Sequence, residues 1–339
     1  MRAAVKNEDT ERSRVAPQGC RGWLFSLAAA VLAFAAGSAC AQQMVLTPVK
    51  ISPHVYYFHG HTGMADPANQ GFMSNAGFVV TPAGVVVFDA LGTPALGEAM
   101  VSAIRTVTAQ PIRRVIVSHY HADHFYGLQA FKAAGAEVWA HENGRQYLAS
   151  DIAPSRLAQR KNDLKPWVNE KTRLVPADRW LHFDAGKTIQ FALGGVHFRV
   201  IDMSGAHSPE DIMLAVDEDK MLFAGDLFFT GRIPFVGEAD SKLWLGALDE
   251  MLKIAPAVVV PGHGEMSREP LKDLQLTRSY LLFLRRAMGD AVADMIPFEE
   301  AYQKTEWKTF ASYPAFVQAN RINAYQTYLL MERESLLAK

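Results

Sequence analysis

The densest group of reactive side chains in this sequence is a short segment, Ser118-His119-Tyr120-His121-Ala122-Asp123-His124. Imidazole nitrogens and carboxylate oxygens are the ligands that zinc takes from a protein without an available thiolate. Four such side chains within six residues are hard to explain as packing, because burying polar rings without partners is costly. In an extended chain His119 and His121 face the same side, so both could bind one ion. The turn that follows would carry Asp123 and His124 toward a second ion.

Three further side chains of the same chemical types occur later, each after an apolar run. They are His207, Asp226 and His263, and each stands within two residues of a glycine. We predict the apolar runs to be buried strands, and strand ends are where a rigid scaffold presents reactive groups. Glycine lets the backbone approach such a site closely. The seven side chains together predict a metal site.

Both cysteines of the chain lie in an N-terminal segment that we predict to be removed. The arginines Arg12, Arg14 and Arg21 precede an apolar run over residues 23–36, and small residues follow, ending in Ala39-Cys40-Ala41. This order is typical of a secretory signal peptide over residues 1–41, and we expect cleavage after Ala41. The mature chain would then offer no thiolate ligand and no disulfide.

The same segment predicts where the protein acts. Cleavage would produce a periplasmic or secreted protein, and the apolar run is shorter than the roughly 20 residues of a transmembrane span. We favour cleavage over lipid attachment at Cys40, because Gly37 stands where lipoprotein sites usually carry leucine; an uncleaved anchor is the other alternative. A formal net charge of −1 gives no basic field. We therefore expect a small-molecule substrate and no nucleic-acid partner.

Strand and helix patterns alternate between residue 44 and about residue 264. From residue 270 the pattern is helical, interrupted by Pro297 and Pro314. We expect a catalytic domain over residues 42–267 and a helical C-terminal extension over residues 268–339 packed on it. The predicted strands are 77–80, 85–89, 115–117, 137–140, 196–201, 212–216, 221–224 and 258–260, and the predicted helices before the extension are 96–107, 126–134, 150–173 and 241–254.

The order of the seven side chains resembles the pattern of the metallo-β-lactamase superfamily, over roughly residues 50–265. The resemblance implies a four-layer αβ/βα sandwich of two mixed β-sheets, with the site at one edge. It also implies two zinc ions per chain. The first would be bound by His119, His121 and His207, the second by Asp123, His124 and His263, and Asp226 would bridge both.

The resemblance further implies an exported hydrolase. A hydroxide bridging the two ions would attack an ester, thioester, lactone or lactam bond, and Asp123 could orient it as well as bind metal. An aspartate at position 226, in place of a cysteine, resembles the pattern of the glyoxalase II, lactonase and phosphodiesterase branches. The segment 207–211, by contrast, resembles the corresponding segment of zinc β-lactamases. Taken with its flanking segments, the chain looks most similar to exported zinc metallohydrolases associated with quinoprotein and sulfur-oxidation systems.

Other functions stay open from the sequence. A persulfide dioxygenase of the same superfamily binds one iron through two histidines and an aspartate, which His121, His207 and Asp226 could supply. A β-lactamase proper is a further alternative, although Phe229 stands where the cysteine-using enzymes carry lysine. A non-enzymatic binding protein is disfavoured because the ligand set is complete. The sequence does not indicate an oligomeric state.

Substrate contacts are predicted in the loops around the site. Arg232 offers a two-pronged donor for a substrate carboxylate, and a structural ion pair explains it equally well. Residues 59–75 join two strand-like segments and could form a mobile flap, from which Phe72 would contact substrate. The remaining polar features are interpreted as loop histidines, at His59 and His61, and as a solvated helical face, over residues 156–167.

Overall fold

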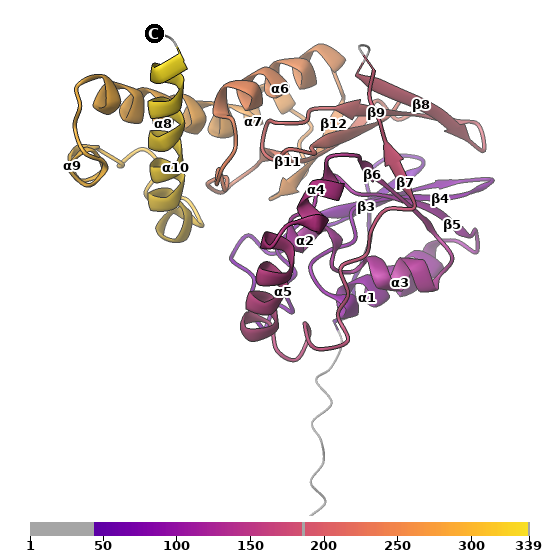
Figure 1. Cartoon of the computed structure of the whole chain (residues 1–339). Helices are drawn as coiled ribbons and strands as arrows, with labels where there is room; N and C mark the ends of the chain where they lie inside the picture. The colour runs from indigo at the N-terminus through magenta and orange to yellow at the C-terminus, as the bar shows by residue number, and fades with distance from the viewer. Residues whose placement is uncertain (1–43, 185–186, 338–339) are drawn as a thin grey trace, which may run out of the picture. The chain divides into compact units, whose positions relative to one another are not determined.

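The structure, a computed structural model, describes residues 44–184 and 187–337 (Figure 1). The predicted signal peptide and its cleavage site lie outside these residues. The described chain is built around two β-sheets. The first contains β1 (Val49–Lys50), β2 (Val55–Phe58), β3 (Ala76–Thr81), β4 (Gly84–Phe88), β5 (Ile112–Ile116), β6 (Glu137–His141) and β7 (Arg179–Leu181), in that order. The second contains, in spatial order, β12 (Val258–His263), β11 (Met221–Phe229), β10 (Ile212–Val216), β9 (Val196–Asp202) and β8 (Thr188–Leu193).

Both sheets are mixed. Strands β1 to β4 pair antiparallel, and β4 to β7 pair parallel because helices connect them. In the second sheet β8 to β11 pair antiparallel, and β11 pairs parallel with β12. Six of the seven candidate ligands follow β5 or lie within β11 and β12, which are strands of these parallel pairs.

Helices follow the strands of each sheet. Those in the first half are α1 (Pro94–Val107), α2 (Ala122–Phe125), α3 (Leu128–Ala133), α4 (Gly144–Ala149) and α5 (Ile152–Asp163). Those in the second half are α6 (Ser241–Ile254), α7 (Pro270–Asp273), α8 (Gln275–Ala293), α9 (Phe298–Lys304) and α10 (Phe316–Leu337). No helix within the described ranges is long and apolar enough to cross a membrane.

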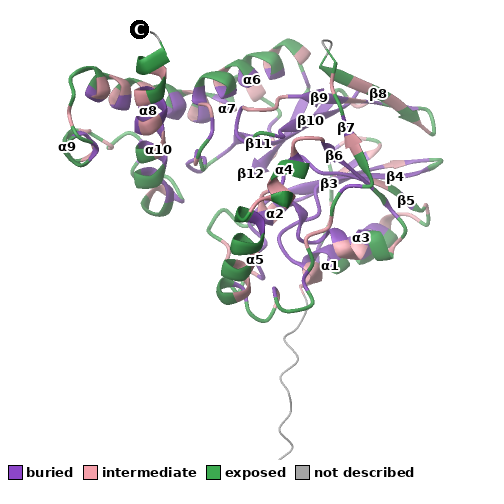
Figure 2. Ribbon diagram, in the orientation of Figure 1, coloured by how far each residue is buried: buried purple, intermediate pink, exposed green. Residues whose placement is uncertain are grey.

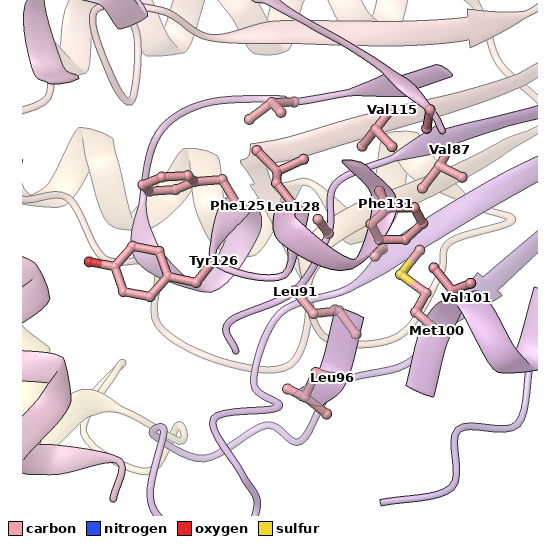
Figure 3. Packing of buried hydrophobic residues seen from close by; sticks show 14 of the residues in the cluster. Val87, Leu91, Leu96, Met100, Val101, Val115, Phe125, Tyr126, Leu128 and Phe131 are labelled. Carbon is pink, nitrogen blue, oxygen red and sulfur yellow. The ribbon is translucent and has the colours of Figure 1, made fainter. Parts of the chain in front are cut away.

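Three buried apolar clusters lie between the layers, and Figure 2 shows the strands of both sheets largely buried. In the first, Val87 and Val115 of one sheet pack with Met100 of α1 (Figure 3). In the second, Phe88 stacks on Phe223 of the other sheet, with ring centroids 5.3 Å apart. The third joins the second sheet to α6 and the C-terminal helices. Burying each such side chain contributes roughly 1.5–3 kcal/mol. The order helix, sheet, sheet, helix confirms the predicted sandwich.

The predicted C-terminal helices are present, and they contact the end of β11 and the loop that follows it. The side-chain amide of Asn323 on α10 accepts from the Val236 backbone N at 2.8 Å and donates to the Pro234 carbonyl at 2.8 Å. On α8, the Thr277 hydroxyl donates to the Phe229 carbonyl at 3.1 Å. Buried polar groups paired in this way fix the position of the helices on β11.

Two predicted strand ends are wrong by several residues. The strand predicted over 221–224 continues to Phe229, and the one predicted over 258–260 continues to His263, so Asp226 and His263 lie within strands. The register between β11 and β12 shifts around Gly225, whose φ is 54°. Glycine tolerates this left-handed backbone, so the pairing continues past the bulge. Two predicted helices are shorter than expected, since α3 begins at Leu128 and α5 ends at Asp163.

Candidate metal centre

The histidine-rich segment leaves β5 and turns into α2. The chain stays extended as far as His121, whose φ is −82° and ψ 144°. Along this extended stretch the rings of His119 and His121 come together, with centroids 4.5 Å apart. The start of α2 then turns Asp123 and His124 into a second group. The local backbone therefore places His119 and His121 in one group and Asp123 and His124 in another, as the sequence predicts.

The first group combines His119, His121, His207 and Asp226, with one candidate ligand atom from each lying within 4.8 Å of the others. The Nε2 atom of His207 lies 3.0 Å from His121 Nδ1 and 3.5 Å from Asp226 Oδ2. The Nε2 atom of His119 lies 3.9 Å from the same carboxylate oxygen. Histidines from two segments thus surround one oxygen of Asp226.

The second group combines Asp123, His124 and His263, whose candidate ligand atoms also lie within 4.8 Å of one another. Asp123 Oδ2 is 3.5 Å from His124 Nε2 and 3.3 Å from His263 Nε2. The other oxygen of Asp226, Oδ1, is 3.1 Å from His124 Nε2 and 3.3 Å from His263 Nε2. Asp226 therefore faces both groups with one oxygen toward each.

The residues present fit metal ions in both groups. The Nε2 atoms of His119 and His124 are buried and have no hydrogen-bond partner among the described residues. An unsatisfied buried polar group costs about 1–3 kcal/mol, so these nitrogens are more stable with a ligand. Imidazole and carboxylate donors suit zinc and also suit iron. The donor set thus suits a metal ion in each group and does not distinguish zinc from iron.

Asp89, which the sequence analysis did not select, orients a candidate ligand in each group, His124 directly and His119 through Ser118. Its Oδ2 lies 2.8 Å from His124 Nδ1 and accepts from the Ser118 hydroxyl at 2.8 Å. The Ser118 Oγ atom is in turn 2.9 Å from His119 Nδ1. Such contacts fix the tautomer that leaves Nε2 free for a metal. Asp89 ends a predicted strand, which is the signal that could have identified it.

The loop that carries His207 is held by two buried carboxyl groups that the sequence did not reveal as functional. Asp211 accepts from the Ser208 backbone N at 2.6 Å and from its hydroxyl at 2.7 Å. Glu210 accepts at 3.1 Å from the backbone N of Tyr120, which lies between two candidate ligands. Burial raises the pKa of Glu210 to about 7. One loop thus carries the candidate ligand His207 and holds the histidine-rich segment.

The protonation of the ligand rings reflects their surroundings. Burial lowers the pKa of His121 to about 4 and that of His207 to about 3, so both rings are neutral near pH 7. Burial also acts to lower the pKa of His124, but the charges of Asp226 and Asp123 outweigh it and raise that pKa well above its ordinary value. The carboxylates therefore attract a cation, and metal binding there competes with a proton.

The two predicted substrate contacts lie in different surroundings. Arg232 is buried, and its pKa is lowered by burial against the opposing charges of Asp226 and Asp123. Phe72 lies in the apolar cluster of the first sheet, and its ring meets that of His61 edge-on with centroids 6.0 Å apart. This packing accounts for Phe72, so its contact with substrate stays a prediction.

The segment predicted to be a flap is irregular and contacts the loop that follows α5. Its Pro67 carbonyl accepts from the indole N–H of Trp167 at 2.8 Å. His59 lies 3.4 Å from Glu265, and neither His59 nor His61 belongs to the metal-ligand groups found in the described residues. The interpretation of these two rings as loop histidines is consistent with this placement.

The comparisons with known proteins agree with this geometry. The sequence model described as the metallo-beta-lactamase superfamily matches residues 69–263, which is more than half of the chain. This chain belongs to the metallo-β-lactamase superfamily.

The relatives share the fold at low sequence identity. The linear primary-alkylsulfatase of Pseudomonas sp. is 19% identical over 61% of this chain and 45% of its own length. The metallo-beta-lactamase type 2 of Elizabethkingia meningoseptica is 26% identical over 57% of this chain and 70% of its own. The structure of the sec-alkylsulfatase Pisa1 from Pseudomonas sp. has a TM-score of 0.64 at 19% identity, covering 84% of this chain and 50% of that one. The chain thus spans about half the length of these alkylsulfatases. The relatives are metal-dependent hydrolases, the class of enzyme predicted from the sequence.

Proposed function

We propose that this protein is an exported hydrolase that binds two zinc ions and cleaves an ester, thioester, lactone or lactam bond of a small molecule. The position of Asp226 carries this proposal, because one carboxylate oxygen faces each ligand group. A histidine whose Nδ1 is hydrogen-bonded to a neighbour can bind a metal only through Nε2, and therefore binds one ion. The shared carboxylate joins the two groups into one binuclear site.

The chain supplies positioning and proton acceptance around that site. Two such ions, when bound, lower the pKa of a water molecule and polarise the bond to be cleaved. Neutral His121 and His207 keep their lone pairs available, and Asp89 holds His124 in the orientation that directs Nε2 to the site. Asp123 is the more accessible of the two ligand carboxylates, with 14% of its side chain exposed against 5% for Asp226. It can therefore accept a hydrogen bond from the attacking water.

An iron-dependent dioxygenase of the same superfamily would use only part of this arrangement. His121, His207 and Asp226 lie together in the first group and could hold one iron. The second group favours the binuclear hydrolase, because Asp123, His124 and His263 bring three further candidate ligand atoms within 4.8 Å of one another. Consumption of a persulfide by the iron-loaded protein, with no hydrolysis by the zinc-loaded protein, would establish the dioxygenase instead.

The hydrolase is tested with a substrate panel and a matched pair of variants. Zinc-loaded protein is assayed with a nitrophenyl ester, a thioester, a lactone and a chromogenic cephalosporin. We expect hydrolysis of at least one of these, and Asp226→Asn should reduce it to background together with the zinc content. The control is Asp290→Asn, which removes an exposed carboxylate on α8. Hydrolysis by Asp226→Asn at the wild-type rate would refute the proposed site.

Export is tested separately by sequencing the N-terminus of the protein from a periplasmic fraction. The proposal expects a mature chain beginning at Gln42. A chain beginning at a lipid-modified Cys40, or an uncleaved chain in the membrane fraction, would contradict it.

A further inference from the structure

Arg232 is a buried cation without a carboxylate partner among the described residues. It is 2% exposed, and its Nε atom is buried and makes no hydrogen bond. Its other contacts are long, with Nη1 at 3.4 Å from the Gly63 carbonyl and Nη2 at 3.9 Å from Met64 Sδ. Contacts of this length contribute little. An unpaired buried charge costs several kcal/mol, so this arrangement needs an explanation.

Arg232 is the one buried arginine among the described residues, and it has no ion pair there. Arg285, which is also partly buried, pairs with Glu334 at 2.7 Å. Arg114 lies 3.7 Å from Glu137. The sequence left open that Arg232 forms a structural ion pair. Among the described residues, no carboxylate forms such a pair with it.

The location of Arg232 relates it to the second ligand group. Thr230, two residues before Arg232, donates its backbone N–H to the carbonyl of His263 at 3.1 Å. From this position the positive charge of Arg232 acts on Asp226 and Asp123. Once these carboxylates bind metal cations, they no longer balance the guanidinium. A loaded site therefore has an excess of positive charge on this side.

We infer that Arg232 binds a carboxylate group of the substrate, next to the second ligand group. This inference rests on the proposed hydrolase function. A guanidinium presents Nε and Nη in one plane and pairs with a carboxylate through two parallel hydrogen bonds. The free Nε and the weakly held Nη atoms of Arg232 are those donors. Gly63 and Met64 contact the guanidinium and are both exposed, so the inference requires these two residues to move aside when the carboxylate binds.

A binding experiment tests the inference without turnover. Glutarate and its uncharged diamide are titrated calorimetrically into zinc-loaded wild type, Arg232→Gln, Arg232→Lys and Arg286→Gln. Arg286 is exposed on α8, so its variant controls for the loss of one positive charge. We expect Arg232→Gln to weaken glutarate binding at least about tenfold, with equal zinc content and no change for Arg286→Gln. Equal glutarate binding by Arg232→Gln and wild type would overturn the inference.

A pair of substrates separates recognition from a role in holding the loop. The pair is mono-4-nitrophenyl glutarate and its neutral methyl ester. Arg232→Gln should lower kcat/KM for the anionic ester at least about tenfold and leave the neutral ester near wild type. Arg232→Lys keeps the charge and should lose less, which also controls for misfolding. An equal loss for both esters would show that Arg232 only positions the loop. If wild type hydrolyses neither ester, the proposed function fails for esters, and glutarate binding still decides the role of Arg232.

Discussion

Replacing Gly262 with alanine should disrupt the metal site through a single methyl group. An added Cβ at this position would lie 2.0 Å from Asp226 Oδ1 and 2.7 Å from the carbonyl carbon of Gly225. Ordinary contacts begin at 3.4 Å, so the carboxylate oxygen would be about 1.4 Å too close. Gly262 is not among the glycines with positive φ, so the alanine backbone itself is not strained. The clash therefore falls on the Asp226 carboxylate and on the backbone of Gly225 and Asp226 that positions it.

The magnitude follows from this clash. Metal sites tolerate ligand displacements of only about 0.2 Å, so Asp226 cannot move aside and stay bound. Overpacking of this kind costs about 1–3 kcal/mol. If zinc binding is weakened by this amount, the zinc affinity falls about 5- to 150-fold. Zinc affinity is measured by competition with a chromogenic chelator.

The matched control is Gly246→Ala on α6, where an added Cβ would meet nothing within 4 Å. This variant should keep wild-type zinc affinity and gain up to about 1 kcal/mol in free energy of unfolding, because alanine favours the helix. Wild-type zinc affinity in Gly262→Ala would refute the reasoning, since the clash requires Asp226 to move.

Three further predictions follow from the groups around the site. Asp89→Asn weakens the acceptor of His124 Nδ1 and should lower zinc affinity about 10- to 100-fold in the same chelator competition; unchanged affinity would be evidence against the positioning role. Because burial raises the pKa of Glu210 from 4.5 to about 7, the protein loses up to about 3 kcal/mol of stability as the pH rises through this window. The Tm advantage of Glu210→Gln over wild type should thus grow between pH 5 and pH 8, and a constant difference would contradict the assignment. Zinc at a thousandfold excess over Kd stabilises the fold by about 4 kcal/mol, so a chelator should lower Tm by several degrees. An unchanged Tm after addition of the chelator would mean that no metal was bound.

The sequence was sufficient to identify the candidate ligands because each stands near the end of a strongly apolar strand. His119 and His121 come together through strand alternation alone, as the extended backbone shows. Asp226 was expected after a strand and lies within one, since hydrophobic periodicity does not register a bulge such as that at Gly225. The four-layer arrangement came from the family resemblance, because spacing does not say which faces of two sheets meet.

The groups that hold the ligands depend on contacts between distant segments. Asp89 reaches Ser118 because β4 and β5 are parallel neighbours, and their residue numbers alone do not indicate this register. Glu210 and Tyr120 are 90 residues apart and meet between a loop and the segment after β5. Arg232 was selected for its residue type, whereas its missing ion pair became visible only once its neighbours were placed.

The most direct test of a shared binuclear site is the metal content of the purified protein, measured by elemental analysis after zinc loading and dialysis. The account predicts about two zinc ions per wild-type chain, and about one for His263→Ala, which removes a ligand of the second group. A single iron per chain, or two zinc ions in both proteins, would contradict it.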